Sequence, residues 1–163
     1  MTDRHIPILP LTAEAFAPFG DVIETGVAPS FQFNAGMADR FHDLARTEAL
    51  DEGRIGISIA RARPYALPLE LTLMERHPLG SQAFVPLTPD PFLVIVASEE
   101  AGAPGPPRAF LTAPGQGVNY LRNIWHGALT PLNRASSFLI VDRIGAGVNL
   151  DEHIWPDPWI IGG

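Results

Sequence analysis

The stretch LPLELTLMERH, residues 67–77, places a leucine at every second position as far as Leu73. The same alternation then continues with Glu75 and His77. Because side chains of a strand point alternately to its two faces, this pattern predicts a strand with a buried face that turns polar at one end. Strands of this kind are typical of a small β-barrel with a packed floor and a binding site at its mouth.

Composition and neighbouring stretches extend this prediction to the whole chain. The 17 prolines and 15 glycines among 163 residues favour short strands over long helices. The runs IGISIARA (55–62), PFLVIVAS (91–98) and SSFLIVDR (136–143) are typical of strands. We therefore expect one mainly β domain over residues 1–163. Its inward side chains should include two alternating sets: Ile55, Ile57, Ile59 and Arg61, and Phe138, Ile140 and Asp142.

Three other segments have their own signals. In LTAEAFAPFG (11–20), Thr12 is suited to cap a short helix that Pro18 and Gly20 then stop. ADRFHDLARTEALDEG (38–53) matches neither the helical nor the strand period, so both a helix and an extended segment stay open. The aromatic tail HIWPDPWIIGG (153–163) suits a segment that lies across its own barrel or against a partner subunit.

Charge and cysteine content exclude several classes of protein. The formal net charge is −7 with no basic run, which argues against nucleic-acid binding. The chain has no cysteine, so disulfides, thiolate metal sites and a cysteine nucleophile are excluded. No apolar run approaches the ~20 residues of a membrane span. We expect a cytoplasmic protein.

Candidate site residues occur at two places. Glu75 and His77 share a strand face, and Gln82 follows after the turn HPLGS (77–81). In GVNYLRNIWH (117–126), alternation puts Tyr120, Arg122, Ile124 and His126 on one face. Other charged residues are candidates for binding or for structural roles.

Arg61 and Arg122 are suited to bind a carboxylate, because a guanidinium can make two parallel hydrogen bonds to it. Arg76 is expected to form a salt bridge in the barrel wall or at a dimer interface. Asp142 is expected to form an ion pair with Arg143 at the edge of the sheet. The role of His42 is left open.

Five stretches together resemble one known family. They are LTAEAFAPFGDVIE (11–24), RFHDL (40–44), ERHPLGSQAF (75–84), GVNYLRNIWH (117–126) and FLIVDR (138–143). In this order they look like ureidoglycolate lyase, within the cupin superfamily, and the likeness spans nearly the whole chain. The resemblance implies a cupin-type double-stranded β-helix barrel, a homodimer, and cleavage of (S)-ureidoglycolate to glyoxylate and urea in allantoin degradation.

The resemblance also implies a ligand set. Glu75, His77 and Gln82 fall at the spacings of the His, His and Glu of the first cupin motif, and His126 falls where the second motif has its histidine. Two of these residue types depart from the pattern, since Glu75 replaces a histidine and Gln82 a glutamate. Such a set can hold nickel, manganese or zinc, but a carboxamide is a weak, neutral ligand, so a metal-free site is equally open.

Roles follow as expectations. Glu75, His77 and His126 are expected to be catalytic, and the sequence does not decide which is acid and which is base. The expected substrate-binding residues are Arg61, Arg122, Gln82 and Tyr120. Two alternatives are a metal-dependent cupin enzyme acting on another small 2-hydroxy or 2-keto acid, and a non-catalytic cupin module that binds small acids.

Overall fold

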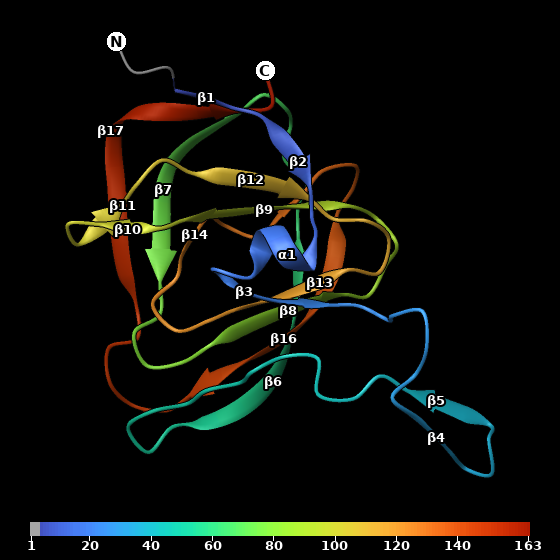
Figure 1. Ribbon diagram of the computed structural model, residues 1–163. Coiled ribbons are helices and arrows are strands. Elements are labelled where there is room, and N and C mark those ends of the chain that lie inside the picture. The colour runs from blue at the N-terminus through green and yellow to red at the C-terminus, as the bar shows by residue number, and fades with distance from the viewer. Residues whose placement is uncertain (1–3) are drawn as a thin grey trace.

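The computed structural model describes residues 4–163, and two β-sheets make up most of it (Figure 1). The larger sheet has eight strands in the order β1-β17-β7-β14-β9-β12-β2, with β15 paired to β9. Its strands are β1 (His5–Ile6), β2 (Ile8–Pro10), β7 (Leu69–Arg76), β9 (Phe92–Ala97), β12 (Arg108–Leu111), β14 (Trp125–His126), β15 (Thr130–Pro131) and β17 (Asp151–Ile161).

The smaller sheet has five strands in the order β3-β13-β8-β16-β6, and its neighbours are all antiparallel. The two sheets together form a nearly closed barrel of the cupin type, so the prediction of a mainly β fold is confirmed. The strands of this sheet are β3 (Gly20–Ile23), β6 (Arg54–Ala62), β8 (Gln82–Pro86), β13 (Gly117–Tyr120) and β16 (Ser136–Ile144).

The main core fills the space between the sheets. Strand β9 is buried along its whole length, as its continuous apolar run predicts. One side of β9 contributes to this main core, and the other side packs in a second cluster with Trp125 and Trp159. The main core draws on both sheets through Phe84, Phe92, Val94, Val96, Val118, Tyr120 and Phe138.

The prediction that Ile55, Ile57, Ile59 and Arg61 of β6 point into the barrel is wrong. Ile57 and Ile59 are 72% and 68% exposed, and Arg61 is exposed with them. The cavity wall instead includes Ala60, which has the opposite parity. The face of β6 that meets the barrel interior carries small residues, including Ala60 and the buried Gly56. The bulky aliphatic side chains lie outside.

The predicted helix is confirmed. Helix α1 spans Ala13–Phe16, and the backbone N–H of Ala15 donates to Thr12 Oγ1 at 3.2 Å. Phe16 at its end is fully buried in the core. The ambiguous segment 38–53 contains no helix: it holds strand β5 (Ala38–Arg40) and an isolated bridge between Ala49 and Gly80.

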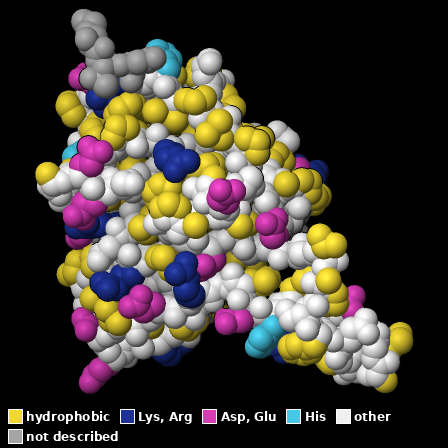
Figure 2. All heavy atoms as spheres, viewed as in Figure 1, with side chains coloured by type: hydrophobic (Ala, Val, Ile, Leu, Met, Phe, Trp, Pro, Cys, Tyr) yellow, Lys and Arg dark blue, Asp and Glu magenta, His cyan; other side chains and the backbone are white. Residues whose placement is uncertain are grey.

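Strand β5 and strand β4 (Phe31–Phe33) form a hairpin that stands away from the barrel, and we call residues 30–42 the arm (Figures 1 and 2). The arm is held by contacts within itself, since Ser30 N donates to Arg40 O and His42 N donates to Ser30 Oγ. Another small hairpin pairs β10 (Glu99–Glu100) with β11 (Ala103–Pro104).

The aromatic tail lies on its own barrel. Strand β17 pairs antiparallel with β7 and parallel with β1, and Trp159 is buried in the second cluster. Ile154 remains 70% exposed. Of the two places that the sequence left open for this tail, the structure therefore shows the first. Within residues 4–163, no helix has the length and hydropathy needed to cross a membrane.

Candidate active site

A cavity of about 280 Å³ opens between the two sheets beside the edge strand β6. Its wall combines apolar side chains with three polar ones from β7, β8 and β14. This is the place where the leucine face of β7 becomes polar, as the alternation in residues 67–77 predicts. The wall consists of Ala60, Leu73, Glu75, Gln82, Phe84, His126, Ala128, Leu129 and Ile140.

Glu75, His77 and His126 converge beside this cavity, and Glu75 and His126 line its wall. Each offers one ligand atom, and these atoms all lie within 4.8 Å of one another. The antiparallel pairing of β7 with β14 sets Glu75 directly opposite His126. His77 follows the end of β7, and its Nε2 is 3.8 Å from Glu75 Oε1. Glu75 and His126, 51 positions apart in the chain, are thus brought together by strand register, which sequence spacing alone cannot show.

Both imidazoles are oriented by backbone carbonyls. His77 Nδ1 donates to Asn149 O at 2.8 Å, and His126 Nδ1 donates to Gly127 O at 3.0 Å. A carbonyl oxygen only accepts, so Nδ1 carries the proton in both rings. This leaves Nε2 of His126 for the cavity and turns Nε2 of His77 toward Gln82 Oε1.

His126 lies in an apolar environment. The pKa of His126 is lowered to about 4, mainly by burial; the nearby His77 also lowers it, and the hydrogen bond to Gly127 opposes both effects. Its ring stacks on Tyr120 with centroids 4.3 Å apart and planes only 5° from parallel. Burial and the charge of Glu75 raise the pKa of Tyr120. His126 is therefore neutral at pH 7, with the lone pair of Nε2 available.

Gln82 is fixed by its neighbours at both ends of its amide. Its Nε2 donates to Asp142 Oδ2 at 3.1 Å, which turns Oε1 toward His77 Nε2 at 3.2 Å. Asp142 therefore makes no ion pair with Arg143, contrary to the simple expectation. Arg143 instead donates to the carbonyl oxygens of residues 50, 51 and 146.

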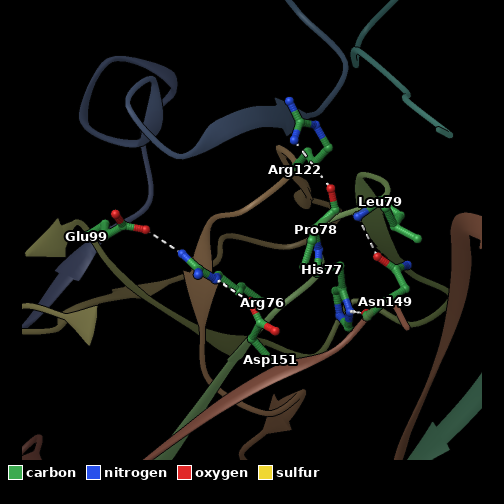
Figure 3. Close-up of polar contacts among 8 residues, drawn as sticks. All are labelled: Arg76, His77, Pro78, Leu79, Glu99, Arg122, Asn149 and Asp151. Carbon is green, nitrogen blue, oxygen red and sulfur yellow. Dashed lines mark hydrogen bonds and ion pairs between the residues drawn. The ribbon is translucent and has the colours of Figure 1, made fainter. Parts of the chain in front are cut away.

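The turn that separates His77 from Gln82 is held from two sides (Figure 3). On one side, Asn149 accepts from His77 and from the backbone N–H of Leu79. On the other, Arg122 Nη1 donates to Pro78 O at 3.3 Å. The figure also shows Arg76 between Asp151 and Glu99, which confirms the predicted salt bridge in the barrel wall.

The two arginines expected at the substrate carboxylate lie elsewhere. Arg61 is on the exposed outer face of β6. Arg122 was expected on one face with Tyr120 and His126, but the chain leaves the strand after Tyr120 and turns through Asn123, which has φ +66°. Its guanidinium consequently pairs with Glu48 and lines a separate hollow. Among the described residues, no arginine lines the 280 Å³ cavity, and the chain has no lysine.

The donor set fits a divalent metal ion. His126 Nε2 is buried without a hydrogen-bond partner among residues 4–163. Both histidines donate their Nδ1 protons to carbonyls, which is the usual arrangement around metal-ligating imidazoles. Together with the Glu75 carboxylate and Gln82 Oε1, they offer nitrogen and oxygen atoms of the kind that nickel, manganese and zinc accept.

Comparison with known proteins decides the family. The sequence model described as ureidoglycolate lyase matches residues 3–162. The chain belongs to the ureidoglycolate lyase family. It is 60% identical over 159 residues to the ureidoglycolate lyase of Chelativorans sp. strain BNC1, covering 97% of this chain and 96% of the relative. It is 56% identical over 160 residues to that of Rhodobacter capsulatus, covering 98% of this chain and 99% of the relative.

For this ureidoglycolate lyase family member, sequence reasoning missed two residues of the site. The alternation of β16 placed Asp142 on the same face as Ile140, which lines the cavity, but the adjacent Arg143 suggested an ion pair instead. Asn149 lies in the loop between β16 and β17, where no periodic pattern exists to reveal it. Both act through hydrogen bonds that depend on how distant strands meet.

Proposed function

We propose that this protein cleaves (S)-ureidoglycolate into glyoxylate and urea, a step of allantoin degradation, as the name of its family indicates. The observation that supports this most directly is the cluster of Glu75, His77 and His126, two of which line a mainly apolar cavity together with Gln82. Apolar neighbours such as Leu73 and Phe84 limit the access of water, and the small volume suits a small substrate.

The reaction moves one proton and breaks one bond. The carbinol hydroxyl loses its proton, its oxygen forms the carbonyl of glyoxylate, and the carbon–nitrogen bond electrons stay with the nitrogen that leaves as urea. We assign the proton transfer to the Glu75 carboxylate, which takes the hydroxyl proton and returns it to the departing nitrogen. General acid–base catalysis of this kind contributes roughly 10²- to 10⁴-fold. No water is consumed.

The remaining polar groups orient the substrate. His126 lines the cavity with an Nε2 that has no hydrogen-bond partner among residues 4–163, and Gln82 beside it holds its amide oxygen toward His77 Nε2. Tyr120 keeps the ring plane of His126 by stacking. The two histidines and Gln82 would hold a divalent metal ion, and a Glu75 carboxylate that also bound the ion would no longer be free to take the proton. Such an ion, when bound, supplies Lewis-acid chemistry that lowers the pKa of the substrate hydroxyl.

The substrate carboxylate needs a binding partner. Neither Arg61 nor Arg122 lines the cavity, so we look for this partner at the polar cluster. In the cluster of Gln82, His77 and His126 the free ring nitrogens and the amide oxygen only accept hydrogen bonds, so we assign the carboxylate to a divalent metal ion that these atoms would hold. Arg61 and Arg122 are then not substrate ligands. The variants Arg61→Lys and Arg122→Lys should keep the KM of the wild-type protein, and a raised KM in either would contradict this assignment.

The test of the reaction is a turnover assay in ¹⁸O-water, with urea and ammonia measured by mass spectrometry. Elimination gives urea without solvent oxygen. Hydrolysis of the ureido carbonyl would give ammonia and labelled carbon dioxide instead. Glu75→Gln, an isosteric variant without the proton carrier, should lose at least about 10²-fold in kcat. Ammonia in place of urea would show that the proposed reaction is wrong.

We further propose that two copies associate through the outer face of β6 and the arm. Ile57 and Ile59 are exposed on the outer face of β6, and Phe31 and Phe33 are exposed on the arm, which stands away from the barrel (Figure 1). A two-stranded hairpin is only marginally stable by itself. In a two-fold dimer, each arm can cover apolar surface of the other copy, so both patches are buried at once.

Location in the cell is a separate proposal. We place the enzyme in the cytoplasm, because a chain without cysteine suits a reducing compartment and its proposed substrate is a product of cellular metabolism. Fractionation of the cells that produce it, with urea release as the assay, would test this.

A further inference from the structure

We propose that Asn149 is a positioning residue for His77, acting on the imidazole and on the turn behind it at the same time. The inference rests on the proposed function, because His77 belongs to the cluster assigned to the reaction. Asn149 lies in the loop between β16 and β17 and does not line the cavity.

The contacts of Asn149 reach two points of the same turn. Its backbone carbonyl accepts from His77 Nδ1 at 2.8 Å, and its side-chain Oδ1 accepts from the backbone N–H of Leu79 at 2.7 Å (Figure 3). Because one residue makes both bonds, the imidazole is fixed relative to the backbone two residues further along. The bond to Nδ1 also fixes the tautomer, so Nε2 is the atom turned toward Gln82 Oε1.

This matters because the turn joins two residues of the site. His77 precedes the turn and Gln82 follows it, and their side chains meet 3.2 Å apart. Other segments hold the turn through its backbone: Asn123 N donates to His77 O, and Leu50 N donates to Leu79 O. Those bonds hold the backbone of the turn against neighbouring segments. The two hydrogen bonds of Asn149 differ, because they connect the backbone of the turn to the imidazole of His77.

Asparagine suits this place for a chemical reason. The side-chain bond requires an acceptor at the end of a short, planar group, which aspartate also provides and leucine does not. The backbone carbonyl bond survives any substitution at this position, but its alignment depends on the side-chain bond that anchors the residue. The pair Asn149→Asp and Asn149→Leu therefore separates loss of the acceptor from change of size.

The first test measures turnover and folding of both variants, with Asn133→Leu as control, since Asn133 is an exposed asparagine of another loop. Loss of groups that orient a catalytic or metal-binding histidine typically costs about 10- to 100-fold. We expect kcat of Asn149→Leu to fall by that factor with little change in KM, and Asn149→Asp to stay near wild type. Wild-type kcat in Asn149→Leu, or an equal loss in both variants, would overturn the proposal.

The second test does not depend on turnover. In chelator-treated protein, ¹⁵N spectra of His77 should show a proton fixed on Nδ1 in wild type and Asn149→Asp, and a tautomer mixture in Asn149→Leu. If Asn149→Leu does not fold, hydrogen exchange of the Leu79 amide in the wild-type protein tests the bond to Asn149 instead, and slow exchange is expected. Exchange as fast as in an unstructured peptide would refute the anchor. A fixed tautomer in a protein that releases no urea would refute the proposed reaction and leave the role of Asn149 standing.

Discussion

His77 Nε2 and Gln82 Oε1 lie 3.2 Å apart, at the two ends of a single turn. Nδ1 of the same ring already donates its proton to Asn149. The amide oxygen and Nε2 are both acceptors in this arrangement, and a cation between them would satisfy both. Gln82 cannot turn its amide round without losing the bond to Asp142.

That geometry makes Gln82→Glu informative. Glutamate restores the residue type of the first cupin motif, but its carboxylate would face the carboxylate of Asp142. We expect kcat to fall by about 10-fold or more, within the range for groups next to catalytic histidines. The double variant Gln82→Glu/Asp142→Asn should recover much of the loss, because asparagine can donate to the new carboxylate. Equal activity of the single and double variants would argue against the Gln82–Asp142 contact.

Burial of His126 predicts a pH dependence of stability in chelator-treated protein. Its folded pKa of about 4 lies below the unfolded value of about 6.5, so the folded state favours the neutral ring. This stabilisation is present in full above pH 6.5 and is lost as the pH falls through 4. Urea unfolding between pH 7 and 4 should therefore show a decline, amounting to about 3 kcal/mol at most. His126→Gln has no titrating group there, and an identical decline in that variant would contradict the assignment.

Removal of divalent metal tests the ligand set. Dialysis against a chelator should abolish urea release, and addition of nickel, manganese or zinc should restore it, if the two histidines and Gln82 hold an ion. Metal content measured by mass spectrometry should fall in His77→Ala and His126→Ala but not in Arg134→Ala, whose side chain pairs with Asp90. Full activity of a metal-free preparation would show that these residues act without an ion.

Arg143 should be important for stability. Its buried guanidinium donates to three backbone carbonyls, and Gly53 and Gly80 pack so closely around it that a Cβ at either would lie under 3 Å from its side chain. Arg143→Met removes the three donors and leaves buried acceptors unpaired. We expect a loss of about 2–4 kcal/mol in the free energy of unfolding. The control Arg134→Met breaks an exposed ion pair and should cost less than about 1 kcal/mol.

The proposed dimer can be tested with introduced cysteines, because the chain has none of its own. A chain with Phe33→Cys and Ile57→Cys should form a disulfide-linked dimer on oxidation if the arm of one copy covers β6 of the other. A mixture of the Phe33→Cys and Ile57→Cys single variants should give a disulfide-linked heterodimer. A control cysteine at Val148, an exposed position outside both patches, should not be linked to Ile57→Cys. A monomeric mass of wild type by light scattering at micromolar concentration would refute the dimer.

The sequence by itself determined the fold class, the capped helix, the buried strand β9 and the polar end of the leucine face on β7. Each of these is a local property, because the alternation of side chains and the conformational limits of proline and glycine act within a few residues. The family likewise follows from the sequence, since its characteristic stretches run through nearly the whole chain.

Only the tertiary structure decided which side of β6 faces inward and where the arginines lie. Alternation gives two faces but does not say which one meets the core, and on β6 the larger aliphatic residues lie outside. Arg122 does not share a face with Tyr120 and His126, because strand β13 ends at Tyr120 and the alternation does not continue beyond it. The roles of Gln82, Asp142 and Asn149 depend on the register of strands far apart in the chain, and register is set by packing of the whole barrel.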